Sequence, residues 1–127
     1  MPGTPGDIQV ISSKTSPTVP SMVSGGGEAR ALVWPGMGAK TRSLHLIHLM
    51  PKDTTCEFKH ASEAVYYVVK GEVTAIDLDS DDTHHVSEGG MIFVEPGTKY
   101  VLSCSDGPSD VVGGPCPPDP SLYREMA

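Results

Sequence analysis

Basic residues are scarce in this chain, and their scarcity excludes several classes of partner. Nine Lys and Arg stand against sixteen Asp and Glu, so the formal net charge is −7. Nucleic acids and acidic membranes attract proteins mainly through Lys and Arg. No basic cluster along the chain is long enough to offset the acidic excess. We therefore expect neither a nucleic acid nor a membrane as partner.

Cysteines and long apolar runs are also sparse. The three cysteines are widely spaced and form no Cys-x-x-Cys pair, so neither a disulfide framework nor a zinc knuckle is indicated. No apolar run reaches the roughly 18 residues that a membrane span requires. The N-terminus lacks the charged and apolar regions of a signal peptide. These absences predict a cytoplasmic protein with reduced thiols.

Sustained helical periodicity is absent too, and strand patterns take its place. A chain of 127 residues is long enough for one domain with a single core. Turn signals at Pro35-Gly36, Lys70-Gly71 and Pro96-Gly97 separate segments rich in β-branched and aromatic residues. The pattern predicts an all-β domain with strands at 28–34, 43–50, 64–69, 73–78, 91–94 and 99–104.

The two ends of the chain differ from this strand-rich middle. Residues 1–27 are rich in Pro, Ser, Thr and Gly and predict a flexible N-terminal arm, in which 7–12 could pair as an edge strand and 24–27 act as a hinge. Residues 113–127 form a Pro-rich tail, which is extended over 113–120 because proline excludes helix and which could form a terminal turn at 123–126. We expect this tail to pack on or near the domain formed by residues 28–112.

Two blocks within the domain carry paired sequence motifs. Residues 51–72 read PKDTTCEFKHASEAVYYVVKGE, and residues 89–104 read GGMIFVEPGTKYVLSC. Their hydrophobic and turn positions match without gaps the two motifs of the cupin superfamily, so the chain resembles a small single-domain cupin. The resemblance implies a jelly-roll barrel, the double-stranded β-helix, with an internal pocket. It also implies a homodimer, which is common among small cupins.

The resemblance also locates the four positions at which a cupin usually holds a metal through three His and one Glu. With Gly71 setting the register, these positions fall on Phe58, His60, Ala64 and Tyr100. Of the usual ligands only His60 is present, which predicts a degenerate metal site. We expect no cofactor. The alternative is one divalent transition metal, Zn, Fe, Mn, Ni or Cu, bound by His60 with other donors.

Strand alternation predicts which side chains line the pocket. Residues two apart in a strand share a face, so an inward His60 or Tyr100 brings its alternate neighbours inward with it. The expected lining is Cys56, Phe58, His60, Ala64, Tyr66, Val68, Tyr100, Leu102 and Cys104. A mostly apolar cavity with a few convergent polar groups is typical of a small-molecule site.

We favour an enzyme that acts on a small organic molecule by proton transfer. An imidazole can give or take a proton near neutral pH, so His60 would be the general acid or base. Tyr66 and Tyr100 would donate hydrogen bonds to an oxygen that gains charge. The resemblance implies isomerase, cyclase or lyase chemistry. Because the lining holds few charges, we expect a neutral or singly charged, partly apolar substrate.

Two alternatives stay open. A metal-dependent dioxygenase or isomerase would use His60 with His45 or His48, with Glu63 through a β-bulge, and with a cysteine. Since His45 and His48 lie three apart in a strand, only one of them can face the cavity. The other alternative is a non-catalytic ligand-binding or structural barrel, as in metal-free cupins of the ethanolamine-utilisation type.

Overall fold

The computed structural model describes residue 6, residues 8–104 and residues 106–126, which fold into strands and two short 3₁₀ helices. The strands are β1 (Val23–Ser24), β2 (Glu28–Val33), β3 (Leu44–Leu49), β4 (Thr54–Thr55), β5 (Phe58–Lys59), β6 (Glu63–Lys70), β7 (Glu72–Asp77), β8 (Thr83–Ser87), β9 (Met91–Val94), β10 (Lys99–Ser103) and β11 (Ser109–Cys116). The helices are η1 (Pro35–Met37) and η2 (Pro120–Met126). Neither has the length and apolar character needed to cross a membrane, in the part of the chain that the structure describes.

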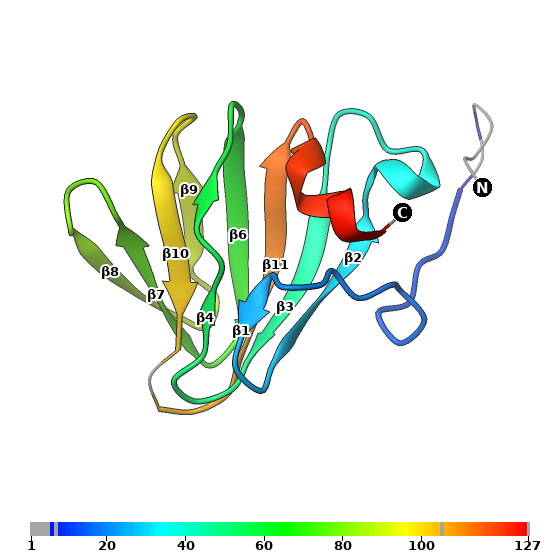
Figure 1. Cartoon of the computed structure of the whole chain (residues 1–127). Helices are drawn as coiled ribbons and strands as arrows, with labels where there is room; N and C mark the ends of the chain where they lie inside the picture. The colour runs from blue at the N-terminus through cyan, green and yellow to red at the C-terminus, as the bar shows by residue number, and fades with distance from the viewer. Residues whose placement is uncertain (1–5, 7, 105, 127) are drawn as a thin grey trace.

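Two antiparallel sheets form the barrel (Figure 1). Sheet A has the strand order β2-β3-β11-β6-β9. Sheet B has the order β1-β4-β10-β7-β8, with β5 also paired to β10. The chain passes from one sheet to the other after β1, β3, β5, β6, β8, β9 and β10, so most strands that are consecutive in sequence lie in different sheets. The predicted all-β, single-domain cupin barrel is confirmed.

The core lies between the sheets because side chains alternate along each strand. In β6, Ala64, Tyr66 and Val68 are buried while Tyr67 and Val69 face outward. The other central strands show the same period of two. Each fully buried aliphatic or aromatic side chain contributes about 1.5–3 kcal/mol to folding, so the barrel is stabilised mainly by these inward faces.

Residues 16–24 pack against the barrel and are more ordered than the flexible arm that the sequence predicts for 1–27. Val19 and Met22 are buried in the core, β1 pairs with β4, and an isolated bridge joins Thr18 to Arg30. Burial of these two apolar side chains, together with backbone hydrogen bonds from Val19 to Ala29 and from Ala31 to Pro17, holds this otherwise polar segment against the barrel. The edge strand expected at 7–12 does not form at residues 8–12, and residue 7 lies outside the described residues.

Strand β11 continues four residues past the domain boundary placed at 112, to Cys116, and lies between β3 and β6. Glycine permits this close packing, since a Cβ on Gly114 would lie 2.7 Å from His45 Nδ1. The chain then turns through a cis Cys116–Pro117 bond. Helix η2 follows and lies in front of β11 and β3 in Figure 1.

The Gly-rich segment 24–27 holds a buried carboxylate and does not act as a hinge. Asp53 accepts hydrogen bonds from the backbone N–H groups of Gly26 (3.0 Å), Gly27 (2.7 Å) and Met50 (2.9 Å). A Cβ on Gly25 would lie 1.6 Å from Asp53 Oδ1, and the φ of Gly25 is +123°. Burial opposes ionisation, but the three N–H donors outweigh it and hold the pKa of Asp53 below its ordinary value.

We expect Asp53→Ala to lower the free energy of unfolding by about 3 kcal/mol at pH 7, because three backbone donors lose a charged acceptor. Urea denaturation measures the change. Asp82→Ala, exposed in the turn between β7 and β8, is the matched control, with an expected change below about 0.5 kcal/mol.

The sign of the pH dependence follows from the lowered pKa. The stabilisation by Asp53 is fully present above its unfolded pKa of 3.8 and is lost as the pH falls through the folded pKa. The gap in stability between wild type and Asp53→Ala should therefore shrink below about pH 4. A gap that keeps its size in acid would show that the carboxylate charge is not responsible.

Candidate functional site

Inward-facing side chains of β5, β6 and β10 meet inside the barrel. Eight of the nine expected lining residues are buried there, and the ninth, Cys56, is half-buried. Tyr100 on β10 is the cross-strand partner of Phe58 on β5, and their rings are 5.2 Å apart. His60 follows β5 directly, and Tyr66 comes from β6 in the facing sheet. Both sheets thus supply polar groups to one interior.

Four polar side chains form a continuous hydrogen-bonded chain in this interior. His60 Nδ1 lies 2.7 Å from Asp119 Oδ2, and His60 Nε2 lies 2.9 Å from the Tyr100 hydroxyl. The hydroxyls of Tyr100 and Tyr66 are 2.7 Å apart. His60, Tyr66 and Tyr100 are each 3% exposed or less. The structure therefore brings the three expected catalytic residues together and adds Asp119 to them.

The ionised carboxylate sets the direction of the hydrogen bonds. Asp119 can only accept, so His60 Nδ1–H donates to it. In a neutral imidazole Nε2 is then an acceptor, and the Tyr100 hydroxyl donates to it. The Tyr100 oxygen in turn accepts from the Tyr66 hydroxyl. A carboxylate that holds the distal nitrogen of a histidine fixes its tautomer and stabilises the imidazolium that forms when Nε2 takes a proton.

The two phenols of this chain are hydrogen-bond donors and not bases. Desolvation by burial raises the pKa of Tyr100 far above its ordinary value, and the neighbouring Tyr66 raises it further. Burial likewise raises the pKa of Tyr66, against a partial lowering by its hydrogen bond with Tyr100. Both hydroxyls stay protonated at neutral pH. The neutral hydroxyls can stabilise negative charge that develops on a nearby oxygen.

Asp119 is the functional candidate that sequence reasoning missed. It lies 59 residues from His60 in the chain, in the Pro-rich tail. Burial opposes its ionisation, but hydrogen bonds from His60 and Ser121 outweigh this and hold the pKa of Asp119 below its ordinary value. Asp119 lies among prolines and belongs to no sequence motif that would predict its contact with the buried imidazole of His60.

The same tail also hydrogen bonds to a second buried histidine, His45. His45, 1% exposed, has Nδ1 3.0 Å from the Gly113 carbonyl and Nε2 2.8 Å from the Tyr123 hydroxyl. The carbonyl can only accept, so Nδ1–H donates and Nε2 accepts from Tyr123. Trp34 packs on Tyr123, with ring centroids 5.4 Å apart. The tail therefore contributes one hydrogen-bonding side chain to each buried histidine.

Comparison with known proteins agrees with this architecture. The family model described as "Cupin domain" matches residues 45–111, which is more than half of the chain. The chain is a cupin. None of the curated proteins matches it.

Solved structures extend the likeness to the rest of the barrel. The polyketide cyclase RemF from Streptomyces resistomycificus superposes with a TM-score of 0.71 at 20% identity, covering 88% of this chain and 83% of that one. The ethanolamine utilization protein Q of Salmonella typhimurium, described as putative, also reaches 0.71, at 12% identity over 94% and 93% of the two chains. An RmlC-like cupin from Shewanella frigidimarina reaches 0.68 at 13% identity, over 95% and 97%. At these identities the likeness shows the fold alone.

Two of the expected metal helpers, Glu63 and His48, lie outside the site, whereas His45 is buried on the inward face of β3. Glu63 is exposed at the start of β6 and pairs with Cys116 in regular register, so no bulge turns it inward. His48 faces outward and is bonded to Asp110 (2.6 Å). Cys104 is buried in the expected lining, and Cys56 is half-buried.

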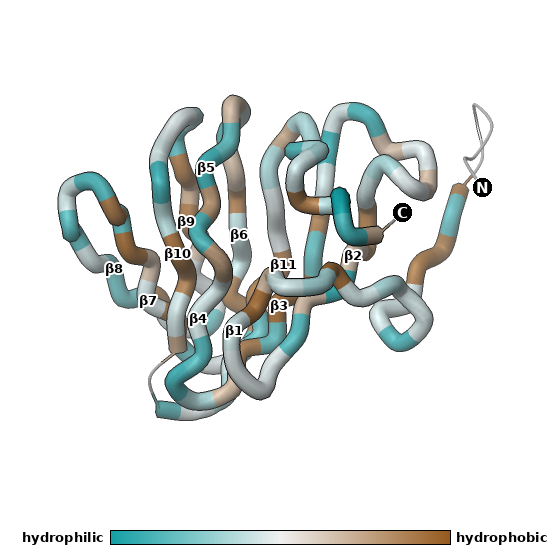
Figure 2. Tube along the Cα trace, viewed as in Figure 1, coloured by the Kyte–Doolittle hydropathy of each residue, from teal (hydrophilic) through white to brown (hydrophobic). Residues whose placement is uncertain are grey.

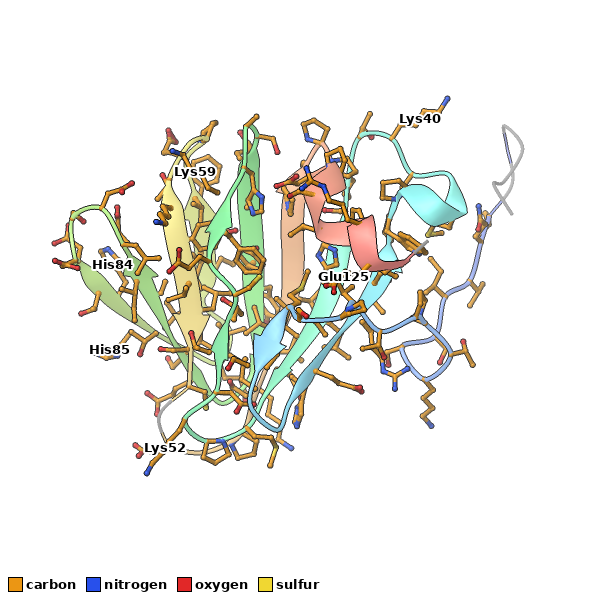
Figure 3. The ribbon with its side chains drawn as sticks, viewed as in Figure 1. Lys40, Lys52, Lys59, His84, His85 and Glu125 are labelled. Carbon is orange, nitrogen blue, oxygen red and sulfur yellow. The ribbon has the colours of Figure 1, made fainter. Side chains whose placement is uncertain are left out.

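The two remaining histidines, His84 and His85, are exposed on β8, as their place beside an acidic loop indicates (Figure 3). They lie on the strand at the outer edge of sheet B, away from the two buried histidines.

The donors of this cupin do not fit the metal that many members of the family hold. Phe58, Ala64 and Tyr100 stand at three of the four usual ligand positions, and both nitrogens of His60 are already hydrogen bonded. Among the described residues, no group of three or more His, Cys, Asp or Glu is arranged to hold a metal ion. We therefore derive no catalytic step through a metal.

A cleft reaches the same interior from the edge where β8 and β9 end the two sheets. It has a volume of about 210 Å³ and is lined by Ala75, Ile76, Asp77, His84, Ile92, Phe93, Val94, Glu95, Thr98 and Tyr100. Apolar side chains form most of the wall, and Asp77, Glu95 and His84 are polar groups at its margin. Tyr100 belongs to both the cleft and the hydrogen-bonded chain, so the two are contiguous.

The buried His45 should make stability depend on pH. Desolvation by burial lowers its pKa from 6.5 to about 4, against a raising effect of the Gly113 carbonyl. The unfolded chain takes up this proton near pH 6.5 and the folded chain only near pH 4. Stability should therefore fall as the pH drops from about 6.5 to about 4, by roughly 3 kcal/mol.

Urea denaturation of wild type and His45→Gln between pH 7.5 and about 4 tests this expectation. His45→Gln should be less stable at pH 7 and should show a flatter pH dependence. His84→Gln, at an exposed position, should keep the wild-type slope. An unchanged slope in His45→Gln would assign the pH dependence to other groups.

Elemental analysis of tag-free, chelator-washed protein should find substoichiometric metal, because the donors around His60 do not form a ligand set. Any loosely bound metal should disappear in the His84→Ala/His85→Ala variant. One metal per chain, lost only in His60→Ala, would instead establish a metal site of unusual composition at His60.

Proposed function

We propose that this cupin is an enzyme that binds a small, uncharged organic molecule beside Tyr100 and catalyses a proton transfer. One observation carries the proposal, namely the hydrogen-bonded chain from the partly buried Asp119 to the buried His60, Tyr100 and Tyr66, with contacts of 2.7, 2.9 and 2.7 Å. Burying linked polar side chains costs desolvation energy that an apolar core would avoid. Such an arrangement in a barrel interior is typical of a site selected for chemistry.

In this proposal His60 is the general base, Asp119 stabilises its protonated form, and the tyrosine hydroxyls donate hydrogen bonds to the substrate oxygen. A substrate with a carbonyl group would place its oxygen at the Tyr100 and Tyr66 hydroxyls. The Tyr100 hydroxyl would then stop donating its hydrogen bond to His60 Nε2 and donate it to the substrate oxygen instead. The freed Nε2 faces the same space, and Asp119 keeps the opposite nitrogen hydrogen bonded throughout.

The reaction balances without an oxidant or a cofactor. His60 Nε2 takes a proton from the carbon next to the carbonyl, and the electron pair of that C–H bond moves to form the enolate. Asp119 stabilises the resulting imidazolium, while the two phenols hydrogen bond to the enolate oxygen. Return of the proton to another carbon gives an isomerase. Attack of the enolate carbon on a second carbonyl, whose oxygen takes the proton, gives a cyclase.

The cleft supports an uncharged, partly apolar substrate. Ala75, Ile92 and Val94 line it, with the side chain of Phe93 at the β9 edge. The charged groups at its margin are the carboxylates of Asp77 and Glu95, which repel anions. RemF, which shares the fold, is described as a polyketide cyclase. A molecule with two or more carbonyl groups would suit both this cleft and the proposed reaction.

Solvent exchange tests the proposal whatever the final product is, because every version of the reaction begins with the same C–H bond. Small 1,3-dicarbonyl and acetylphenol compounds would be incubated with the protein in D₂O, and ¹H NMR would follow the loss of the C–H signal next to each carbonyl. Wild type should accelerate exchange in at least one compound. His60→Ala and Tyr100→Phe should lower the rate by about 10²–10³-fold.

Two further variants separate catalysis from structure. Asp119→Asn should lower the rate with little change in KM, because it weakens the imidazolium and not substrate binding. Tyr67→Phe, on the outer face of β6, is the matched control for Tyr100→Phe and should exchange at the wild-type rate. Binding without exchange, unchanged by His60→Ala, would favour a non-catalytic binding barrel. Exchange that requires added metal would favour the metal-dependent alternative.

A further inference from the structure

Asp119 ties the start of η2 to the proposed site through its two carboxylate oxygens. Oδ1 accepts hydrogen bonds from the backbone N–H (2.9 Å) and the hydroxyl (2.7 Å) of Ser121, as the side chain of a helix cap does. Oδ2 accepts from His60 Nδ1. The backbone N–H of Leu122 also donates to the Asp119 carbonyl, at 3.1 Å. The contact of this carboxylate with His60 therefore depends on η2 being in place.

The rest of η2 is only partly packed on the barrel. None of its seven residues is buried, although Leu122, Tyr123 and Met126 rest against the core. Hydrophobic and hydrophilic residues are mixed along the helix (Figure 2). A 3₁₀ helix of this length is unusual, because its hydrogen-bond geometry is poor. Segments that bury little apolar surface open locally at a low free-energy cost.

A cleft of about 210 Å³ lies between η2 and the N-terminal segment. It is lined by Val19, Pro20, Ser21, Met22, Cys56, Ser121, Leu122 and Glu125. One side of the helix therefore faces open space, where its side chains lack the attractive contacts of a packed surface. The specific contacts of Asp119 and Tyr123 consequently carry a larger share of the attachment of η2 to the barrel.

Tyr123 attaches the middle of η2 by a hydrogen bond and by aromatic packing. Its hydroxyl donates to His45 Nε2 at 2.8 Å, and burial raises the pKa of Tyr123 to about 12, so the hydroxyl keeps its proton. The ring centroid lies 5.4 Å from that of Trp34 and 5.7 Å from that of His45. The imidazole is fixed in turn, because Nδ1 donates to the Gly113 carbonyl at 3.0 Å.

We propose that Tyr123 and His45 are positioning residues that latch η2, and that the latched helix holds Asp119 on His60 and covers the interior of the barrel. When the latch opens, Asp119 leaves His60 Nδ1, and the imidazole loses the carboxylate that stabilises its protonated form. Opening also gives small molecules access to His60, which is 3% exposed in the latched protein. The catalytic consequence rests on the proposed function, whereas the latch is a property of the substrate-free protein.

Amide hydrogen exchange of the substrate-free protein tests the latch. The N–H groups of Ser121 and Leu122 are the reporters, because both donate to Asp119. Tyr123→Phe keeps the aromatic ring and removes the hydroxyl. It should speed exchange at both reporters about 5–10-fold, the effect of losing one hydrogen bond. Tyr67→Phe, on the outer face of β6, is the matched control and should leave both reporters unchanged.

Two substitutions of His45 test its part in the latch. The side-chain oxygen of Gln can still accept the hydrogen bond of Tyr123, whereas Leu cannot. His45→Leu should therefore speed exchange at the reporter amides at least as much as Tyr123→Phe does, and His45→Gln should speed it less. Circular dichroism and a thermal melt confirm that each variant is folded. Equal effects of Gln and Leu in folded proteins would overturn the role of His45 as the acceptor.

The exchange reaction in D₂O tests whether the latch acts through Asp119. Tyr123→Ala removes both the hydroxyl and the ring, and it should lower kcat about 10-fold by displacing the carboxylate from His60. Once the carboxylate is absent, loss of the latch should cost nothing more. Tyr123→Ala/Asp119→Asn should therefore be no slower than Asp119→Asn alone.

The outcomes separate the latch from the proposed reaction. Unchanged exchange at the reporter amides in folded Tyr123→Phe would overturn the latch. Faster amide exchange with a wild-type kcat in Tyr123→Ala would overturn the positioning role, as would fully additive losses in the double variant. A wild type that acts on none of the compounds would count against the proposed function alone, and amide exchange would still decide the latch.

Discussion

A buried imidazole needs a hydrogen-bond partner for each nitrogen, and that requirement shapes this barrel. His45 and His60 are both almost completely enclosed. The barrel strands supply a partner for one nitrogen of each, Gly113 for His45 and Tyr100 for His60. The second partners, Tyr123 and Asp119, come from the last residues of the chain. An unpaired buried polar group costs about 1–3 kcal/mol, so these two contacts are a physical reason for the tail to close the barrel.

The same burial decides the protonation states on which chemistry in this site depends. Desolvation keeps the Tyr66 and Tyr100 hydroxyls protonated and His45 neutral. Asp119, in contrast, is held ionised by the hydrogen bonds it accepts. The row of hydrogen bonds therefore has a carboxylate, Asp119, at one end and neutral donors, the two tyrosine hydroxyls, at the other. A proton accepted at His60 would be stabilised on the side of Asp119, and negative charge on the side of the phenols.

Strand alternation gives sheet A two different faces. In β6, Tyr66 faces the hydrogen-bonded interior while Tyr67, the next residue, faces outward. In β9, Ile92 lines the cleft and Met91 is exposed. An exposed apolar side chain on the outer face adds little to the barrel's own core. Phe93, on the edge strand β9, is exposed and also lines the cleft.

The sequence by itself determined the local part of this structure. Period-two burial, turn residues and the two cupin motifs were enough to predict the barrel and the inward direction of His60, Tyr66 and Tyr100. These properties depend on neighbours in sequence, which a pattern records directly. Sequence reasoning was less accurate for Cys56, which is only half-buried, and it left the direction of Glu63 open. At both positions the strand register decides which way the side chain points.

Tertiary structure alone decided which distant groups meet. Val19 and Met22 join the core from a segment whose composition predicts a flexible arm, because their burial adds to the backbone pairing of that segment with the barrel. Asp53 collects its three N–H donors from loops that no motif connects. Asp119 and Tyr123 reach the buried histidines across 59 and 78 residues of chain. No local pattern encodes such contacts, because they result from the packing of the whole barrel and from the need to pair each polar group that it encloses.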